Sequence, residues 1–334
     1  MARQLHRLLF IRTDRLGETL LNLPAVAALQ AALPDASVSL LVHPELAPLL
    51  AEIPGLAGVL TVPSTAAGPW WVRAWRMGRS LSRHQFDCAI VSNPKKELHA
   101  AVWLAGIPVR VGYGRKWGCL LTRRLVDRKA LGERHEVEYN LDLVRSLDLP
   151  ARALPWRFPS FSREQDDVFR LPELQGHSPS EPLLAVHPFS STPVKRWPAE
   201  RYRQLIRLAT DQLRARVVVV GGPETRDDVS TLLPTEGRAV NLVGRLTLRQ
   251  LAGLLQRARL LVSNDSGPVH LASAVGTRTV VLFGAAHPAA GSRRWGPWGP
   301  GHTVIARASL AEITVEEVFE AIRGILNCPL HAAS

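Results

Sequence analysis

Apolar residues in this chain fall into short runs that alternate with longer stretches of helical period. In the first half, four such runs predict strands, at residues 8–12, 37–42, 59–62 and 88–91. Other stretches predict helices at residues 17–33, 70–82 and 96–105. Because strands alternate with helices, the pattern predicts parallel β-α-β units.

The alternation weakens between residues 149 and 181, where prolines accumulate, and it restarts at residue 183. The second half predicts strands at residues 183–187, 216–221, 260–263 and 279–283. It predicts helices at residues 199–213, 248–257, 269–275 and 314–326. The last of these has Thr314 as its N-cap and acidic residues in its first turn.

Together these patterns predict an α/β protein built from two doubly wound parallel sheets. The expected domains span residues 1–160 and 183–313, with a linker at 161–182 and a C-terminal helix and tail at 314–334. Sheets of this kind bind ligands at the carboxyl ends of their strands. A cleft is expected where two such domains face each other.

Length and composition agree with this picture. A chain of 334 residues with a hydrophobic share of 46% suits two ordinary globular domains. No apolar stretch is long enough to span a bilayer, and the run at residues 8–11 is too short for a signal peptide. Cys88, Cys119 and Cys328 show no metal-ligand spacing, and so few cysteines favour a reducing compartment. We therefore expect a cytoplasmic protein and predict no metal site.

The net charge of +12 is unevenly distributed. Residues 73–134 contain fourteen Lys or Arg against four Asp or Glu. Such a region can be an ordinary solvated surface, or it can bind an anionic partner such as nucleic acid, an acidic membrane or a phosphorylated glycolipid. The basic residues form no dense tract and no recognition motif for nucleic acid, which we therefore do not expect as a partner.

The strongest candidate for chemistry is the run Asn-Asp-Ser-Gly-Pro-Val-His at residues 264–270. It follows a predicted strand, and a helix begins near Pro268, which suits a first helical turn. The helix N-terminus favours an anion, and the carboxylate of Asp265 suits sugar hydroxyls. His270 lies one turn into the helix. The alternative is a simple strand–helix turn in which Asp265 or Ser266 only caps the helix.

Two further segments follow strands of the second half. After the strand that ends at His187, a loop carries hydroxyls at Ser190, Ser191 and Thr192 and then Lys195, a set that can bind a diphosphate. After the four-valine strand, a Gly-Gly turn leads to Glu224, which can accept hydrogen bonds from ribose hydroxyls or cap the next helix. Trp197 is interpreted as a packing residue.

A fourth segment, residues 12–24, links the first strand to the first helix and contains Glu18. A carboxylate there can act as a general base, but acidic residues also often complement the dipole at the start of a helix, and this segment alone favours that second role. The chain contains no phosphate-binding loop of the Walker type, no G-x-G-x-x-G, no H-E-x-x-H and no nucleophile elbow.

In order and spacing these four segments resemble glycosyltransferase family 9, the ADP-heptose:lipopolysaccharide heptosyltransferases. The resemblance covers nearly the whole chain and is most specific at residues 195–198, 265–272 and 282–284. It implies a GT-B fold of two Rossmann-like domains, and inverting transfer from a nucleotide-sugar donor, ADP-heptose, held mainly by the C-terminal domain. The acceptor would be an anionic glycolipid, phosphorylated Kdo–lipid A, with peripheral contact at the inner membrane.

The resemblance also implies roles for individual residues. Lys195 matches the diphosphate-binding lysine, Ser190 and Ser191 match hydroxyl residues near the same phosphates, and Glu224 matches the acid that contacts ribose. Asp265, Ser266, Gly267 and His270 match the loop that binds the donor sugar and phosphate. Glu18 falls where the family usually has an aspartate proposed as the catalytic base. Glutamate keeps the carboxylate of that aspartate but adds one methylene group. Asp14 is the second candidate for the catalytic base.

A single displacement then needs Glu18 to take the acceptor proton and Lys195 to stabilise the departing ADP, with domain closure excluding water. The basic region would meet the acceptor, and the candidates are Arg73, Arg76, Lys95, Lys96, Arg115 and Lys116. Alternatives are a transferase of the same family with another nucleotide sugar or a soluble acceptor, and a nucleotide-sugar epimerase or binder on the same fold.

Overall fold

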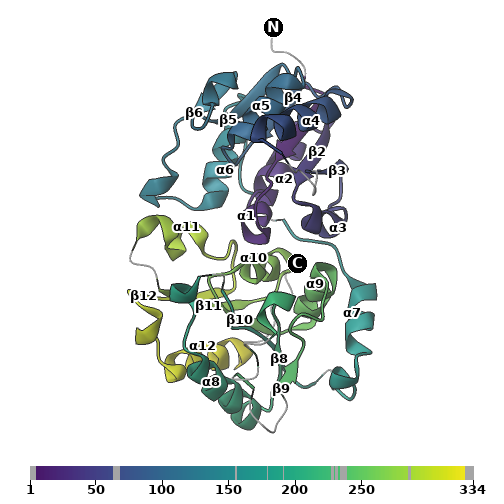
Figure 1. Cartoon of the computed structure of the whole chain (residues 1–334). Coiled ribbons are helices and arrows are strands. Elements are labelled where there is room, and N and C mark those ends of the chain that lie inside the picture. The colour runs from purple at the N-terminus through teal and green to yellow at the C-terminus, as the bar shows by residue number, and fades with distance from the viewer. Residues whose placement is uncertain are drawn as a thin grey trace. The chain divides into compact units, whose positions relative to one another are not determined.

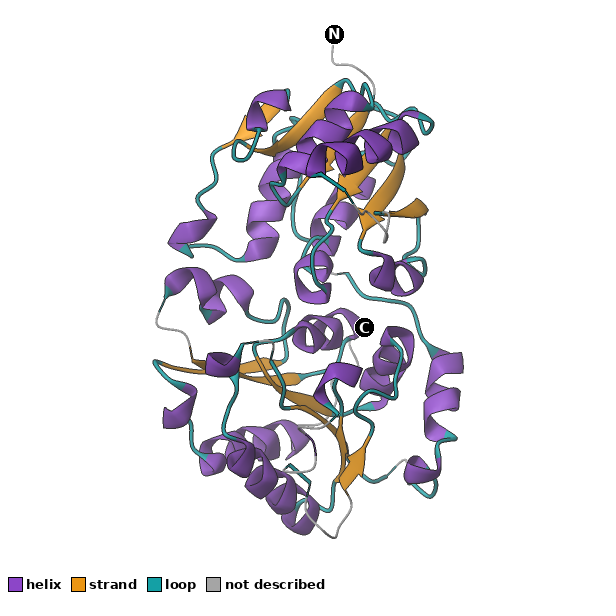
Figure 2. Cartoon of the chain, in the orientation of Figure 1, coloured by secondary structure: helices purple, strands orange, loops and turns teal. Residues whose placement is uncertain are grey.

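The chain divides into two compact units, Met1–Trp156 and Arg157–Ser334, in the computed structural model of the protein (Figure 1). The structure describes residues 5–62, 68–154, 156–178, 180–190, 192–226, 229, 232–233, 239–284 and 287–327. In these residues each unit contains one six-stranded sheet, and the strand pairings are parallel (Figure 2). The predicted α/β fold class with two doubly wound sheets is therefore confirmed.

The N-terminal sheet has the strand order β3-β2-β1-β4-β5-β6. Its strands are β1 (Arg7–Ile11), β2 (Ser37–Val42), β3 (Leu56–Thr61), β4 (Cys88–Val91), β5 (Val109–Tyr113) and β6 (Arg123–Leu125). Its helices are α1 (Leu16–Leu20), α2 (Leu23–Ala32), α3 (Ala47–Leu50), α4 (Trp70–Ser82), α5 (Lys96–Leu104) and α6 (Glu136–Arg145). The apolar faces of α4 and α5 pack with β1 and β4 in one core cluster, which includes Leu9, Met77, Val91 and Leu98.

The single helix predicted over residues 17–33 is divided into α1 and α2. Pro24 lies in the first turn of α2, where its missing N–H is not needed. In the interior of a longer helix the same residue would remove a hydrogen bond and clash with the preceding turn. The chain therefore ends α1 at Leu20 and starts a new helix at Leu23.

The C-terminal sheet has the strand order β12-β11-β10-β7-β8-β9. Its strands are β7 (Leu183–His187), β8 (Arg216–Val219), β9 (Ala239–Asn241), β10 (Leu260–Asn264), β11 (Thr279–Gly284) and β12 (His302–Arg307). Its helices are α7 (Ser162–Phe169), α8 (Ala199–Gln212), α9 (Leu248–Arg257), α10 (Gly267–Val275), α11 (Ser292–Trp295) and α12 (Val315–Asn327).

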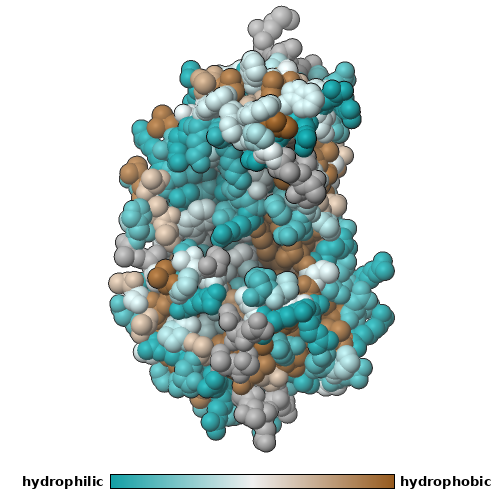
Figure 3. Space-filling view, viewed as in Figure 1, coloured by the Kyte–Doolittle hydropathy of each residue, from teal (hydrophilic) through white to brown (hydrophobic). Residues whose placement is uncertain are grey.

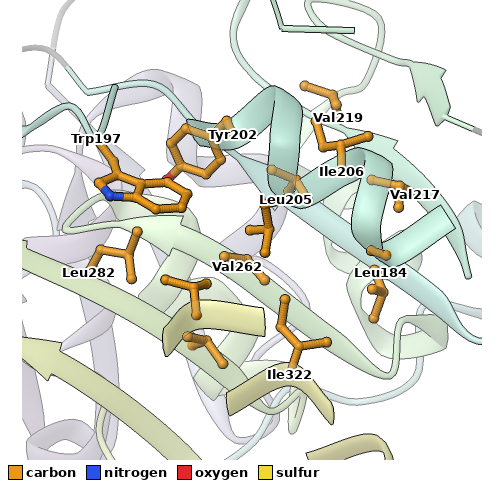
Figure 4. Close-up of a cluster of buried hydrophobic side chains, with 14 of the residues drawn as sticks. Leu184, Trp197, Tyr202, Leu205, Ile206, Val217, Val219, Val262, Leu282 and Ile322 are labelled. Atoms are coloured by element: carbon orange, nitrogen blue, oxygen red, sulfur yellow. The ribbon is translucent and has the colours of Figure 1, made fainter. Parts of the chain in front are cut away.

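The larger core of this unit lies between the sheet and the helices α8 and α12. Side chains from β7, β8, β10 and β11 meet Leu205 and Ile206 of α8 and Ile322 of α12 (Figure 4). Trp197 is buried there at an edge-on angle to the ring of Tyr202, which confirms its interpretation as a packing residue. None of the helices in the described part of the chain has the length and apolar character needed to cross a bilayer.

The segment predicted as a linker, residues 161–182, contains α7, and this helix packs against α9 in the C-terminal unit. Arg249 of α9 donates hydrogen bonds to the carboxylate of Glu164 in α7, which fixes the two helices side by side. The boundaries at residues 160 and 182 stay a prediction.

Candidate active site

The C-terminal sheet reverses its winding direction between β7 and β10, which are neighbouring strands. The chain leaves β7 toward β8 on one side and leaves β10 toward β11 on the other. In open α/β sheets, ligands bind at the carboxyl ends of the strands at such a switch point. Lys195 follows β7 and Asp265 follows β10, and the Lys195 Nζ donates to Asp265 Oδ2 at 2.5 Å.

Asn264, the last residue of β10, anchors the loop that carries Lys195. Its Nδ2 donates to the carbonyl of Pro188 at 2.7 Å, and its Oδ1 accepts from the backbone N–H of Trp197 at 3.1 Å and from the Tyr202 hydroxyl at 3.0 Å. The Trp197 ring N–H in turn donates to the carbonyl of Ile313 at 3.0 Å. The buried amide thus fixes both ends of the loop, so Lys195 is positioned before any ligand arrives.

His187 supports the other side of the junction, because its Nδ1 hydrogen-bonds to the hydroxyls of Ser266 at 3.1 Å and Ser263 at 3.3 Å. The two hydroxyls lie 2.8 Å from each other. Burial lowers the pKa of His187 to about 4. The ring is therefore neutral near pH 7 and acts as a fixed hydrogen-bonding group beneath Ser266.

Ser266 is the N-cap of α10, with extended backbone, and Gly267 and Pro268 form the first turn. The backbone N–H groups of such a turn and the helix dipole attract an anion. His270 lies one turn further and is buried. The predicted run 264–270 thus places a helix N-terminus and a paired carboxylate beside the fixed Lys195, a set that can bind a phosphorylated sugar.

The histidine network gives a testable pH dependence. The pKa of His187 is lowered from 6.5 to about 4 on folding, so the unfolded chain binds the extra proton between these values. The free energy of unfolding therefore has its full value above about pH 6.5. It falls by about 3 kcal/mol as the pH drops toward 4, because the unfolded chain then binds a proton that the folded His187 does not. Urea unfolding of wild type and His187→Asn at several pH values should show that the free energy of unfolding of the variant depends less on pH.

His302→Asn is a matched variant and should show the same kind of reduction, since burial also lowers the pKa of His302 to about 4. Equal pH dependence in wild type and both variants would contradict this assignment.

Glu224 follows β8, the neighbour of β7, in the turn Pro223–Thr225. The residue is exposed, and its carboxylate folds over Gly222, where a Cβ atom would lie 2.2 Å from one carboxylate oxygen. A side chain at position 222 would therefore displace this exposed carboxylate from its present position. The carbonyl of Ser190 accepts from the Arg196 Nε at 2.8 Å, and Ser191 lies outside the described residues.

The N-terminal sheet has the same kind of switch point, between β1 and β4. Asp14 follows β1, and its carboxylate accepts from Asn93 at 2.9 Å and pairs with Lys95 at 2.7 Å, both of which follow β4. Arg12 lies 3.2 Å from the same carboxylate. Each unit therefore carries an Asp–Lys ion pair at its switch point. In the N-terminal unit the aspartate follows β1 and the lysine follows β4, whereas in the C-terminal unit the lysine follows β7 and the aspartate follows β10.

A buried carboxylate extends the N-terminal cluster. Glu136, at the start of α6, is fully buried and pairs with Lys129 at 2.5 Å and Arg12 at 3.6 Å. Lys129 also lies 4.5 Å from the centre of the Tyr113 ring. With Arg12 held between Glu136 and Asp14, the residues that follow β1 have a fixed position.

Two carboxylates near β1 differ in their surroundings. Burial alone would raise the pKa of Asp14, but Arg12, Lys95 and Asn93 outweigh it and hold the pKa below its usual value. Glu18 lies on α1, half-buried, and no residue in the described ranges donates to its carboxylate. A carboxylate that is already paired with cations is a weaker base, so Asp14 is less suited to accepting a proton than an unpaired carboxylate would be.

The basic residues predicted to bind the acceptor are in several different environments. Arg73 donates to both carboxylate oxygens of Glu97, at 3.1 and 2.9 Å, and Arg115 pairs with Asp127 at 2.8 Å. The Lys96 Nζ lies 4.6 Å from the centre of the Trp70 ring. Arg76 and Lys116 are exposed, and Lys95 is the member that lies at the switch point.

Several residues that position the site had no predicted role for their side chains. Arg12, His187 and Asn264 belong to the predicted motifs, whereas Asn93, Glu136, Tyr202 and Ser263 were not among the candidates. The available signal was their place in the chain, since Arg12, His187 and Asn264 lie at or next to the ends of strands. Polar residues there tend to lie at the ligand edge of a parallel sheet. In the described residues no group of three or more His, Cys, Asp or Glu is arranged to hold a metal ion.

Two known structures share this architecture. The Escherichia coli ADP-heptose lipopolysaccharide heptosyltransferase II superposes with a TM-score of 0.81 at 23% identity, over 96% of this chain and 98% of that one. The glycosyltransferase family 9 protein of Veillonella parvula DSM 2008 superposes with a TM-score of 0.86 at 19% identity, over 98% of both chains. These likenesses confirm the predicted GT-B fold.

The chain is also similar in sequence to characterised proteins. Lipopolysaccharide heptosyltransferase 2 of Escherichia coli K12 is 26% identical over 295 residues, which are 84% of each chain. Lipopolysaccharide heptosyltransferase 3 of the same strain is 23% identical over 294 residues, which are 84% of this chain and 82% of that protein. The family model for glycosyltransferase family 9 (heptosyltransferase) matches residues 74–320. The chain therefore belongs to glycosyltransferase family 9 and is a glycosyltransferase.

Proposed function

We propose that the protein transfers a heptose from ADP-heptose to the phosphorylated Kdo–lipid A core of lipopolysaccharide, with inversion at the anomeric carbon. The observation that carries the proposal is the Lys195–Asp265 pair beside the N-terminus of α10, at the switch point of the C-terminal sheet. A lysine and helix N–H groups suit a diphosphate, and a neighbouring carboxylate suits sugar hydroxyls. The names of the relatives support the choice of heptose and lipopolysaccharide.

The chemistry is a single displacement. Glu18 accepts the proton of the acceptor hydroxyl as its oxygen forms a bond to the anomeric carbon. The bond between that carbon and the β-phosphate oxygen breaks, and ADP leaves with the electron pair. Lys195 and the first N–H groups of α10 neutralise the charge that develops on the phosphate. Ser190, Ser191, Glu224, Gly267 and His270 complete the donor site in this proposal.

The two Asp–Lys pairs give the proposal a physical basis in each unit. In the C-terminal unit the ammonium of Lys195 is held by Asp265 until a diphosphate offers it more negative charge. In the N-terminal unit Asp14 holds Lys95, which we assign to an anionic group of the acceptor together with the other basic candidates. The proposed site of action is the cytoplasmic face of the inner membrane.

A donor and acceptor panel tests the proposal. Calorimetry with ADP-heptose, ADP-glucose, UDP-glucose and GDP-mannose should show binding of the ADP sugars and the tightest binding for ADP-heptose. Product analysis with Kdo–lipid A should show heptose transfer with inverted configuration. Tightest binding of a UDP or GDP sugar, or no transfer to this acceptor, would contradict the proposal. Conversion of the donor alone into an epimer would support the epimerase alternative.

A further inference from the structure

Large aromatic side chains are exposed on one pair of helices of the N-terminal unit. Trp71 and Trp75 on α4 and Trp103 on α5 are 59%, 52% and 52% exposed, and Leu104 beside Trp103 is also exposed. Tryptophan in a soluble domain usually buries most of its surface, so three exposed indoles on neighbouring helices need an explanation. We call Trp71, Trp75, Trp103 and Leu104 the α4–α5 aromatic face.

The period of α4 shows why these rings point outward. Ala74, Met77, Gly78 and Leu81 are buried and form the stripe that packs on the core. Trp71 and Trp75 are one turn apart on an exposed flank beside this stripe, followed by Arg79 after another turn. The Arg79 guanidinium lies 5.8 Å from the centre of the Trp75 ring.

Close packing brings the two helices together. A Cβ atom on Gly78 of α4 would lie 2.8 Å from the Leu104 Cβ and 3.0 Å from the Ala101 carbonyl of α5. Glycine therefore allows the helices to touch, and Leu104 lies directly at their contact line. Figure 3 shows brown and pale residues next to strongly hydrophilic ones over α4 and α5.

The polar residues around the aromatic face are cationic. Arg76, Arg79 and Arg83 are exposed, and within the described ranges no acidic side chain pairs with them. Arg73 differs, because it lies between the helices in a bidentate pair with Glu97. The face therefore combines apolar rings with uncompensated positive charge.

We infer that the α4–α5 aromatic face docks on the surface of a membrane that contains anionic phospholipids. Indole rings lie favourably at the boundary between headgroups and acyl chains, and arginines on the same helix pair with lipid phosphates. A second copy of this chain is a poorer occupant, because it would bring arginines of like charge together. A nucleic acid would pair with the arginines but leave the aliphatic Leu104 in water. Docking would bring the active site to a lipid-anchored acceptor, and this link to catalysis rests on the proposed function.

Vesicle binding tests the inference with the full-length chain. Co-sedimentation should show binding to phosphatidylcholine vesicles with about one third phosphatidylglycerol and far weaker binding to pure phosphatidylcholine. Arg79→Gln/Arg83→Gln should weaken binding about 30-fold, from a factor of about 5 to 6 for each of the two charges. Trp71→Ser/Trp75→Ser should weaken it at least about tenfold, and brominated lipid should quench fluorescence of wild type more than of this variant.

Matched controls separate the face from general charge and apolarity. Arg170→Gln/Arg207→Gln removes the same charge from two exposed arginines of the C-terminal unit, and Val126→Ser/Leu131→Ser removes exposed apolar residues outside the face. Both should bind vesicles like wild type. Equal losses in test and control variants, or binding to single-stranded DNA in preference to vesicles, would overturn the inference. So would an aromatic variant that turns a dimer into a monomer by ultracentrifugation without affecting vesicle binding.

The outcome can be distinguished from failure of the proposed function. The face variants should keep wild-type affinity for ADP and wild-type transfer to detergent-dispersed acceptor, because they lie outside the proposed site. Vesicle binding without any heptose transfer would leave the docking surface standing and refute the proposed function. Heptose transfer without vesicle binding would support the proposed function and refute the docking surface.

Discussion

Glu18→Gln should lower kcat by about 10²- to 10⁴-fold while the affinity for ADP stays at its wild-type value. The substitution keeps the length and shape of the side chain on α1 and removes only its ability to accept a proton. The backbone position should not change, since it depends on the Asn22 amide that donates to the Glu18 carbonyl and on the Thr19 hydroxyl that donates to the Arg15 carbonyl. Steady-state kinetics of heptose transfer and calorimetry with ADP measure the two quantities.

Two companion variants make this prediction specific. Glu18→Asp restores the residue type that the family usually has and should retain much more activity than Glu18→Gln. Asp14→Asn should act differently, because Arg12 and Lys95 lose the shared carboxylate that positions them. Its main effect should therefore be on KM for the anionic acceptor and not on kcat. Wild-type turnover in Glu18→Gln, with the large loss in Asp14→Asn instead, would transfer the role of base to Asp14.

Most strands that the sequence predicted are those that the sheet buries on both faces. The exception is the edge strand β3, predicted at residues 59–62, whose positions are exposed or half-buried. The runs that became β1, β4, β7 and β10 are almost fully apolar, and their burial patterns show why. The prediction did not include β5, β6, β9 or β12. In β12 at the sheet edge, Ile305 is the buried position among exposed or half-buried ones, so no apolar run marks the strand. Edge strands need pairing partners that are distant in sequence, and a local pattern does not contain them.

The same distinction applies to the site. Residues 264–270 could be identified from the sequence because strand end, glycine, proline and helix follow one another there. The link from Asn264 to Trp197 and the contact of Arg12 with Glu136 join residues that are far apart along the chain. Glu136 in particular reads as an ordinary acidic residue in the first turn of a helix, and only its complete burial against two cations distinguishes it.

Lys195→Ala should weaken ADP binding by about 10- to 100-fold, the loss expected for one charge-assisted hydrogen bond to phosphate. It should also lower kcat by about 10²- to 10³-fold, because negative charge on the departing phosphate is greatest in the transition state. Calorimetry with ADP and adenosine separates the causes. Adenosine lacks the diphosphate, so its affinity should be the same in wild type and variant. Unchanged ADP affinity, or equal losses for both ligands, would contradict a role in binding phosphate.

Asp265→Asn provides the reciprocal test of the Lys195–Asp265 pair. In the unliganded protein the ammonium lies on Asp265, so a diphosphate must compete with that carboxylate for it. Removing the negative charge should leave ADP binding intact or tighter, while contacts to the donor sugar are lost and kcat falls. If Lys195 instead only stabilised the loop, both variants would weaken ADP binding and lower the unfolding free energy together. Opposite effects on ADP affinity, with similar melting temperatures, therefore distinguish a lysine that exchanges Asp265 for phosphate from one that only joins β7 to β10.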